Sequence, residues 1–243
     1  VLHELGVKSY EFGVQSSISG LKSKVKKELG LNPDKPVMTL MPGSRPHEIK
    51  KLTPVMLEVV KEMKSRYPDY QFVIPIAPNL INSEVQKIRS YFSQLLRFPT
   101  SQLLFLNCNS VKALLASDIA VIASGTSTLQ AAFLRVPMVV VYKLSPLTFF
   151  IGKIIVKVKH IALANILLDK SIKNASSFRI KELLQHNVNA ENIMAELTKI
   201  ISDSKYRDEM MLQLDRIRNL FIDKTASLKV AETVEELGVE SNV

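Results

Sequence analysis

The amino-acid sequence predicts an α/β protein with a Rossmann-like, doubly wound parallel sheet and additional C-terminal helices. Short apolar runs at residues 37–41, 71–76, 103–106, 119–122 and 138–142 have the length and composition of buried strands. Segments with helical spacing separate most of these runs, and such alternation is typical of a parallel sheet covered by helices on both faces. The chain has 243 residues, of which 47% are hydrophobic, so it can bury a core of this kind.

The beginning of the chain is less regular than the rest. We expect residues 1–35 to form a leading segment or linker, in which apolar residues recur every four positions and predict a helix over 17–31. Gly30 and Pro33 end that helix. Residues 36–243 then form the main Rossmann-like domain and its C-terminal helices.

The helices of the main domain are indicated by start signals and by apolar stripes. Thr53 followed by Pro54 predicts the start of the helix after the first strand, because proline fits the first helical position. One apolar stripe predicts an amphipathic helix over 145–159. The other segments that we expect to be helical are residues 79–96, 110–116, 180–186, 190–203, 205–221 and 224–237.

A turn rich in serine, glycine and threonine follows the strand at 119–122 and opens a helix. Ligands bind at the carboxyl ends of the strands in open parallel sheets, and free N–H groups at a helix N-terminus favour phosphate. An ordinary surface turn with helix-capping residues is the alternative, and the turn alone does not decide between them. The candidate ligand contacts in this turn are Ser124, Gly125, Thr126 and Ser127.

A second turn, Pro42-Gly43-Ser44-Arg45, follows the strand at 37–41 and therefore lies at the same edge of the predicted sheet. An arginine in this place can make paired hydrogen bonds to a diphosphate. The alternative is that Arg45 forms an ion pair with Glu48. Two such turns at one edge favour a phosphate-bearing ligand, with Gly43, Ser44 and Arg45 among its contacts.

The charge of the chain points to anionic partners. The net charge is +9, and between residues 143 and 173 six lysines stand against one acid. The helix at 145–159 either packs its stripe on the sheet or presents Phe149, Phe150, Lys153 and Lys157 to an anionic membrane surface. No aromatic residues are interleaved with the basic ones, so we expect no nucleic-acid partner.

Other classes of site are not indicated. The four histidines show no metal-ligand spacing, so we expect no metal, and no phosphate-binding Walker loop or nucleophile elbow occurs. The single cysteine excludes a disulfide within the chain and fits a reducing compartment. No apolar run approaches the roughly 18 residues that a membrane span needs.

Taken together, the motifs resemble those of the lipid-A-disaccharide synthase family, whose members are glycosyltransferases of the GT-B fold. The similarity runs along about residues 36–235 in matching order and spacing. The motifs that carry it are Leu40–Arg45 with Glu48-Ile49, Ala123–Leu129, Val136–Lys143, Ser145–Phe149, Ile155–Lys157, Asn165–Leu167 and Glu182–Gln185.

The resemblance implies an inverting enzyme that transfers diacylglucosamine from UDP-2,3-diacylglucosamine to 2,3-diacylglucosamine 1-phosphate. It implies no cofactor, a peripheral place at the cytoplasmic face of the inner membrane, and it leaves a homodimer open. This chain would be the carboxyl-terminal, UDP-binding half. Arg45 would hold the diphosphate, the 124–128 turn would lie under it, Asn165 would line the nucleotide pocket, and Glu182 and Gln185 would close it from the start of a late helix.

Three departures from the family pattern qualify this expectation. Gln130 stands where the family commonly has an acid that accepts hydrogen bonds from the ribose, so we expect weaker nucleotide binding. About seven extra residues lie around 172–178. The half that carries the acceptor site and general base has no counterpart before residue 36, so no catalytic residue is assigned.

Two alternatives to this enzyme half remain. The first is a non-catalytic relative that keeps the fold and the membrane surface without tight nucleotide binding. The second is a different GT-B enzyme, such as a sugar-nucleotide epimerase or a peptidoglycan glycosyltransferase. The motifs at Ser145–Phe149 and Asn165 argue against the second alternative.

Overall fold

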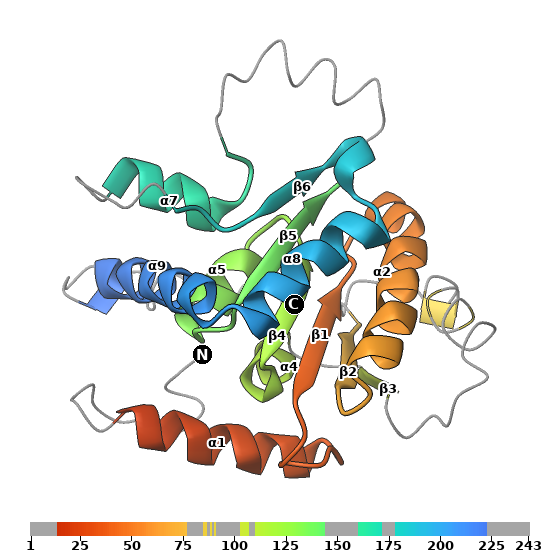
Figure 1. Cartoon of the computed structure of the whole chain (residues 1–243), viewed down its shortest axis with the longest axis horizontal. Coiled ribbons are helices and arrows are strands. Elements are labelled where there is room, and N and C mark those ends of the chain that lie inside the picture. Colours follow the sequence, from red (N-terminus) through yellow and green to blue (C-terminus); the bar gives the residue numbers. More distant parts are fainter. Residues whose placement is uncertain are drawn as a thin grey trace, which may run out of the picture.

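The described part of the chain forms one sheet of six parallel strands in the order β3-β2-β1-β4-β5-β6 (Figure 1). The computed structural model describes residues 14–76, 85–86, 88, 90, 103–106, 110–143, 160–171 and 178–222. The strands are β1 Val37–Met41, β2 Gln71–Pro75, β3 Leu103–Leu106, β4 Ile119–Ala123, β5 Met138–Tyr142 and β6 Glu182–Leu184. The doubly wound α/β class and the five strands expected from apolar runs are confirmed.

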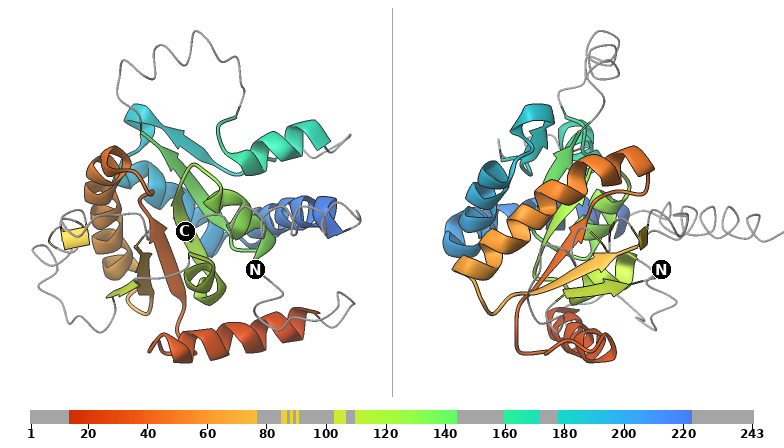
Figure 2. Two further views of the ribbon diagram at one scale, coloured as in Figure 1. Left: turned by 180° about the vertical axis from the view of Figure 1, so that it is seen from behind. Right: turned by 90° about the vertical axis from the view of Figure 1, so that its right-hand side faces the viewer.

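Helices cover both faces of this sheet. Within the described ranges, the helices with defined ends are α1 Val14–Glu28, α2 Pro46–Arg66, α4 Ser110–Ala116, α5 Ser127–Phe133, α7 Leu163–Ser171, α8 Ala190–Ser202 and α9 Ser204–Ile222, with a 3-10 turn η2 at Gln185–Asn187. The helices α2 and α8 pack together on one face, whereas α4 and α5 lie on the other (Figure 2). The helix α1 packs against α4, and α9 contacts α5, α7 and α8.

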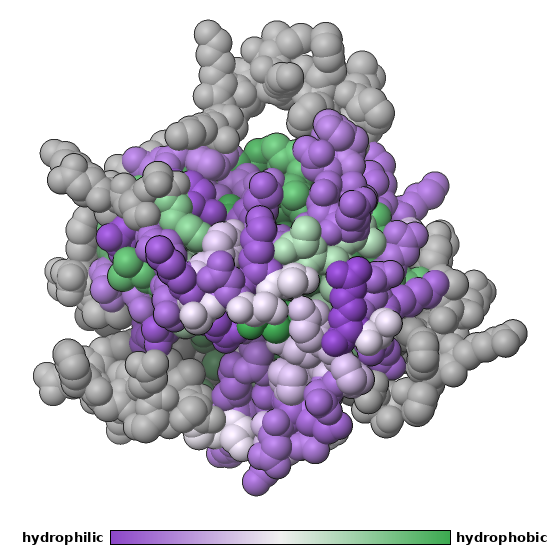
Figure 3. All heavy atoms as spheres, viewed as in Figure 1, coloured by the Kyte–Doolittle hydropathy of each residue, from purple (hydrophilic) through white to green (hydrophobic). Residues whose placement is uncertain are grey.

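The strands are continuous apolar runs because both of their faces are buried. Every residue of β1, β2 and β4 is buried, and the largest core side chains include Phe72, Met38 and Leu40. On the face shown in Figure 3, hydrophilic residues cover most of the described surface. Among the described large hydrophobic residues, Leu212 is the one that is clearly exposed, at 46%.

A partly buried acid, Asp118, ties α1 to the amino edge of the sheet. The Asp118 carboxylate accepts hydrogen bonds from Lys22 Nζ at 2.8 Å, from Lys26 Nζ at 2.9 Å and from the Val37 N–H at 2.8 Å. Burial by itself raises the pKa of Asp118, but the charge of Lys22 and these hydrogen bonds outweigh it and hold the pKa below its usual value. The boundary between the leading segment, residues 1–35, and the main domain, residues 36–243, stays a prediction.

The start of α2 differs from the sequence expectation, which placed it at Thr53. The helix begins at Pro46, and Thr53 and Pro54 lie inside it. The apolar face continues toward the N-terminus through the buried Ile49 and Leu52. Burial of these two side chains therefore favours the earlier start, although Pro54 removes one helical hydrogen bond.

The segment 180–186 is not a helix, and this corrects the expected setting of Glu182 and Gln185. Residues 182–184 form β6, which pairs with β5 in the register Val140↔Glu182, and Gln185 begins the 3-10 turn η2. Pairing with a strand more than forty residues earlier satisfies the backbone here, which local periodicity does not reveal.

The helices expected at 110–116, 190–203 and 205–221 are confirmed with shifts of one residue at their ends, as α4, α8 and α9. The segments 145–159 and 224–237 lie outside the described residues. The same holds for the side chains expected to face a membrane, namely Phe149, Phe150, Lys153 and Lys157. Within the described ranges, no helix combines the length and hydropathy that crossing a membrane requires.

Candidate functional site

The two turns expected to bind a ligand lie side by side at the carboxyl edge of the sheet. Strands β1 and β4 are direct neighbours, and Met41 pairs with Ile122 at their carboxyl ends. The strand order reverses between these two strands, since β2 and β3 continue on one side and β5 and β6 on the other. This is the topological switch point at which open α/β sheets bind ligands.

The first turn is shaped by a glycine and a buried acid. Gly43 has a φ of +104°, a conformation that favours glycine. A Cβ atom at Gly43 would lie 2.3 Å from Glu48 Oε2, so glycine also makes room for the carboxylate. Glu48 Oε2 accepts hydrogen bonds from the backbone N–H groups of Ser44 at 3.3 Å and of Arg45 at 3.4 Å.

Arg45 caps α2 from an extended conformation and forms an ion pair with the same acid. Its Nη1 atom lies 3.1 Å from Glu48 Oε1. The Arg45 side chain is 68% exposed, while that of Glu48 is 7% exposed. The ion pair that the sequence left open is therefore present, and it leaves most of the Arg45 side chain exposed.

The second turn has a glycine that the fold itself does not require. Gly125 has no positive φ, and a Cβ atom there would meet no heavy atom within 4 Å. Among the described residues, the N–H groups of Gly125, Thr126 and Ser127 have no hydrogen-bond partner. A glycine with open space above it and adjacent free N–H groups is the arrangement that lets an anion approach the backbone.

The hydroxyl groups of the second turn divide into two sets. Thr128 Oγ1 donates to the Gly125 carbonyl at 2.8 Å, and Ser124 Oγ donates to the Ile161 carbonyl at 3.2 Å, so both are used within the protein. The side-chain oxygens of Thr126 and Ser127 have no such partner among the described residues. These two hydroxyls remain free to meet a ligand.

Gln130 lies one turn further along α5. Its Oε1 atom accepts a hydrogen bond of 2.9 Å from Ser110 Oγ at the start of α4. The carbonyl that could accept from a ribose is therefore already engaged in part.

Glu182 connects β6 to the second turn through the chain at residue 161. Its Oε2 atom accepts the Ile161 N–H at 2.7 Å, and the Ile161 carbonyl accepts the Ser124 hydroxyl. Its Oε1 atom accepts from Asn165 Nδ2 at 2.6 Å and lies 3.3 Å from His160 Nδ1. In this arrangement Glu182 holds the backbone that supports the Ser124 turn.

Asn165 is completely buried. Its amide donates to the Ile180 carbonyl at 2.8 Å and accepts the Ile180 N–H at 3.0 Å, in addition to its bond with Glu182. The expectation placed Asn165 in the lining of a nucleotide pocket. The structure places it beneath Glu182, where it fixes the entry into β6.

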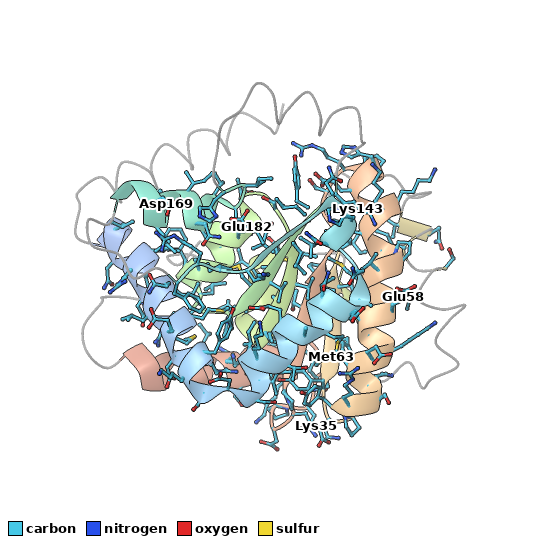
Figure 4. All side chains as sticks on the ribbon, turned by 45° about the horizontal axis from the view of Figure 1, so that its top comes forward. Lys35, Glu58, Met63, Lys143, Asp169 and Glu182 are labelled. Carbon is cyan, nitrogen blue, oxygen red and sulfur yellow. The ribbon has the colours of Figure 1, made fainter. Side chains whose placement is uncertain are left out.

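His160 and Asp169 extend this cluster and were missed by sequence reasoning. His160 Nε2 lies 3.4 Å from Asp169 Oδ2, and Arg179 Nη2 lies 2.6 Å from Asp169 Oδ1. Figure 4 shows Asp169 and Glu182 close together between α7 and β6, while Lys143 lies beyond the end of β5. No sequence spacing indicates such a cluster, because its members belong to separate segments of the chain. The described residues include no group of three side chains arranged to hold a metal.

Gln185 stands at the carboxyl end of β6 with an unusual backbone. Its φ is +53°, and its Nε2 atom is buried without a hydrogen-bond partner in the described part of the chain. Such strain and an unpaired buried donor are typical of sites that are completed by a ligand.

Comparison with known proteins adds the family. The sequence model described as lipid-A-disaccharide synthetase matches residues 16–233. The lipid-A-disaccharide synthase of Anaeromyxobacter dehalogenans (strain 2CP-C) is 35% identical over 220 residues, covering 90% of this chain and 54% of that protein. The synthase of Coxiella burnetii (strain Dugway 5J108-111) is 32% identical over 216 residues, covering 89% and 53%. The chain therefore spans about half the length of the curated relatives it matches.

Two solved structures share the fold. Anabaena Alr3699/HepE in complex with UDP-glucose has a TM-score of 0.58 at 13% identity, covering 89% of this chain and 53% of that one. The UDP-GlcNAc 2-epimerase from Neisseria meningitidis bound to UDP-GlcNAc has a TM-score of 0.52 at 16% identity, covering 92% and 51%. These likenesses show the fold alone. The match of the family along nearly all of the sequence decides the relationship: the chain belongs to the lipid-A-disaccharide synthetase family.

Proposed function

We propose that this chain is the donor-binding half of a lipid-A-disaccharide synthase. It binds UDP-2,3-diacylglucosamine, and the whole enzyme transfers the diacylglucosaminyl group to 2,3-diacylglucosamine 1-phosphate with inversion. The family membership and the names of the relatives support this assignment. The single observation that carries it is the pair of turns at the switch point between β1 and β4.

In this proposal the pyrophosphate of the donor lies between the two turns. The free N–H groups of residues 125–127 and the hydroxyls of Thr126 and Ser127 meet one side of it, and Arg45 meets the other. Negative charge grows on UDP as it leaves, and fixed donors with a guanidinium stabilise that charge without having to reorganise. This chain would therefore lower the barrier by holding the leaving group.

Gln130 and Gln185 complete the nucleotide site in this proposal. Gln130 meets the ribose, and the partial engagement of its carbonyl by Ser110 is a second reason to expect weak binding of that sugar. Gln185 offers the unpaired amide donor at the end of β6. Glu182 and Asn165 act from below, through the hydrogen bond to Ile161.

The proposed partners are the UDP-sugar lipid, an anionic membrane surface at the cytoplasmic face of the inner membrane, and a second copy of the enzyme. The net charge of +9 supports the membrane surface. Phe149, Phe150, Lys153 and Lys157 remain the predicted contacts. The protein should co-sediment with vesicles in which about one third of the lipid is anionic. The double variant Lys153→Glu, Lys157→Glu should stay in the supernatant.

Titration calorimetry with UDP tests the proposed function. Arg45→Ala should weaken binding by about 2 kcal/mol, the loss expected for a charged hydrogen bond. Arg66→Ala is the matched control, because Arg66 pairs with Glu62 at 3.0 Å at the other end of the same helix. No heat with millimolar UDP and folded protein would reject the function. Equal losses in both variants would remove Arg45 from the site.

A non-catalytic relative is the second candidate, and the engaged carbonyl of Gln130 favours it. A cell-free assay separates the two, with the amino-terminal half of a relative such as the Anaeromyxobacter enzyme supplied separately. Formation of the disaccharide product supports the synthase. UDP binding without any product, when the supplied half is active with its own partner, supports the non-catalytic relative.

A further inference from the structure

We propose that Glu48 is a positioning residue of the diphosphate site, whose buried carboxylate fixes the guanidinium of Arg45 toward the ligand. The inference rests on the proposed function, because it assigns a further residue to that site. Glu48 is 5% exposed, and among the described residues the hydrogen-bond partners of its carboxylate are Ser44 and Arg45. A carboxylate is rarely buried without a role, since burial strongly disfavours its charge.

The two oxygens of Glu48 have separate partners. Oε2 accepts the backbone N–H groups of Ser44 and Arg45, which holds the turn at the start of α2. Oε1 accepts Arg45 Nη1. Glu48 therefore does more than complete the helix start, because one of its oxygens is committed to the arginine.

The pair leaves Arg45 able to bind a second anion. A guanidinium carries five N–H groups in a rigid fork, and Glu48 takes one of its nitrogen atoms. Among the described residues, Nε and Nη2 of Arg45 have no partner, and the side chain is 68% exposed. An arginine that is held in place before binding loses less conformational freedom when the diphosphate arrives.

A second ion pair on α2 shows what an ordinary surface contact looks like here. Glu62 and Arg66 are 49% and 56% exposed, so both ends of that pair are solvated. In the pair of Glu48 with Arg45, the acid is buried and the arginine points outward. The glycine at position 43 makes this possible, since any Cβ atom there would collide with the carboxylate.

The substitution Glu48→Gln separates the two tasks of the acid. The amide oxygen of glutamine can still accept the backbone N–H groups, whereas its NH₂ group cannot accept from Arg45. We expect UDP to bind about tenfold more weakly to Glu48→Gln in calorimetry. In the background of Arg45→Ala, the same substitution should cause no further loss. Glu62→Gln is the matched control and should bind UDP like the wild type.

The possible outcomes distinguish a failure of this inference from a failure of the proposed function. If the wild type binds UDP but Glu48→Gln binds it equally or more tightly, the inference fails and the function stands. The inference also fails if the losses of Glu48→Gln and Arg45→Ala simply add. If the folded wild type does not bind UDP, both fail.

A measurement on the wild type covers the case in which Glu48→Gln does not fold. In nitrogen NMR of the ligand-free protein, hindered rotation should give the two Nη atoms of Arg45 separate signals. A single averaged signal would show that Glu48 does not hold the guanidinium, and it would overturn the inference.

Discussion

The substitution Gly125→Ala should weaken ligand binding without weakening the fold. The backbone of Gly125 suits any residue, and a methyl group there would contact no described atom within 4 Å. We therefore expect the free energy of unfolding to stay within about 0.5 kcal/mol of the wild type or to rise slightly, because alanine restricts the unfolded chain.

The effect on UDP follows from the same open space. The methyl group would occupy the approach to the free N–H groups of residues 125–127 and would push a phosphate oxygen away from at least one of them. Losing one hydrogen bond to a charged group costs about 2 kcal/mol. This corresponds to a dissociation constant that is about thirtyfold higher.

Urea denaturation and UDP calorimetry on the same samples measure both effects. Gly20→Ala is the matched control, because Gly20 also has open space around it but lies in α1, which is tied to the amino edge of the sheet. That control should bind UDP normally. Wild-type affinity in Gly125→Ala would show that no ligand approaches this turn, and it would refute the reasoning.

Three further predictions concern stability, each measured by urea denaturation. Gly43→Ala should lower the free energy of unfolding by about 3 kcal/mol, because of backbone strain and the collision with Glu48. A loss below about 1 kcal/mol would show that the turn adapts and would contradict this reasoning. Asn165→Ala should lose about 3 kcal/mol because both backbone groups of Ile180 lose their partner; a neutral result would contradict the structure. Because the pKa of Asp118 is lowered in the folded protein, its charge contributes fully to the free energy of unfolding above about pH 4, and this contribution is lost as the pH falls through the folded pKa. The free energies of unfolding of the wild type and of Asp118→Asn should therefore converge in acid. A constant difference down to pH 2 would contradict this.

The interior strands were predictable because a parallel strand that is buried on both faces is a continuous apolar run in the sequence. The edge strand β6 was not, because it has three residues and includes the charged Glu182. Only its pairing with β5 makes it a strand, and that contact spans more than forty residues. The local periodicity of residues 180–186 predicted a helix instead.

The start of α2 shows a conflict between two local signals of similar strength. Pro46 and Pro54 both fit a first helical position. Burial of Ile49 and Leu52 against the core decides for the earlier one. Tertiary packing therefore settles a boundary that capping rules leave open.

The two turns of the candidate site were predictable from local motifs together with the rule for sheet edges. The supporting contacts were not, since they join residues that are distant in the sequence. Glu182 reaches Ile161 across 21 positions, and Ser124 reaches the same residue across 37. The burial of Glu48 was equally hidden, because a sequence shows an acid in the first helical turn but not how deeply it lies.

The most direct test of the central claim is to follow the backbone amide signals of both turns by NMR during a titration with UDP. The claim predicts that the signals of Ser44 and Arg45 and those of residues 125–127 shift together, with one shared dissociation constant. Uridine, which lacks the diphosphate, should leave them nearly unchanged. Shifts confined to one turn, or different constants for the two turns, would contradict a single diphosphate site at this edge of the sheet.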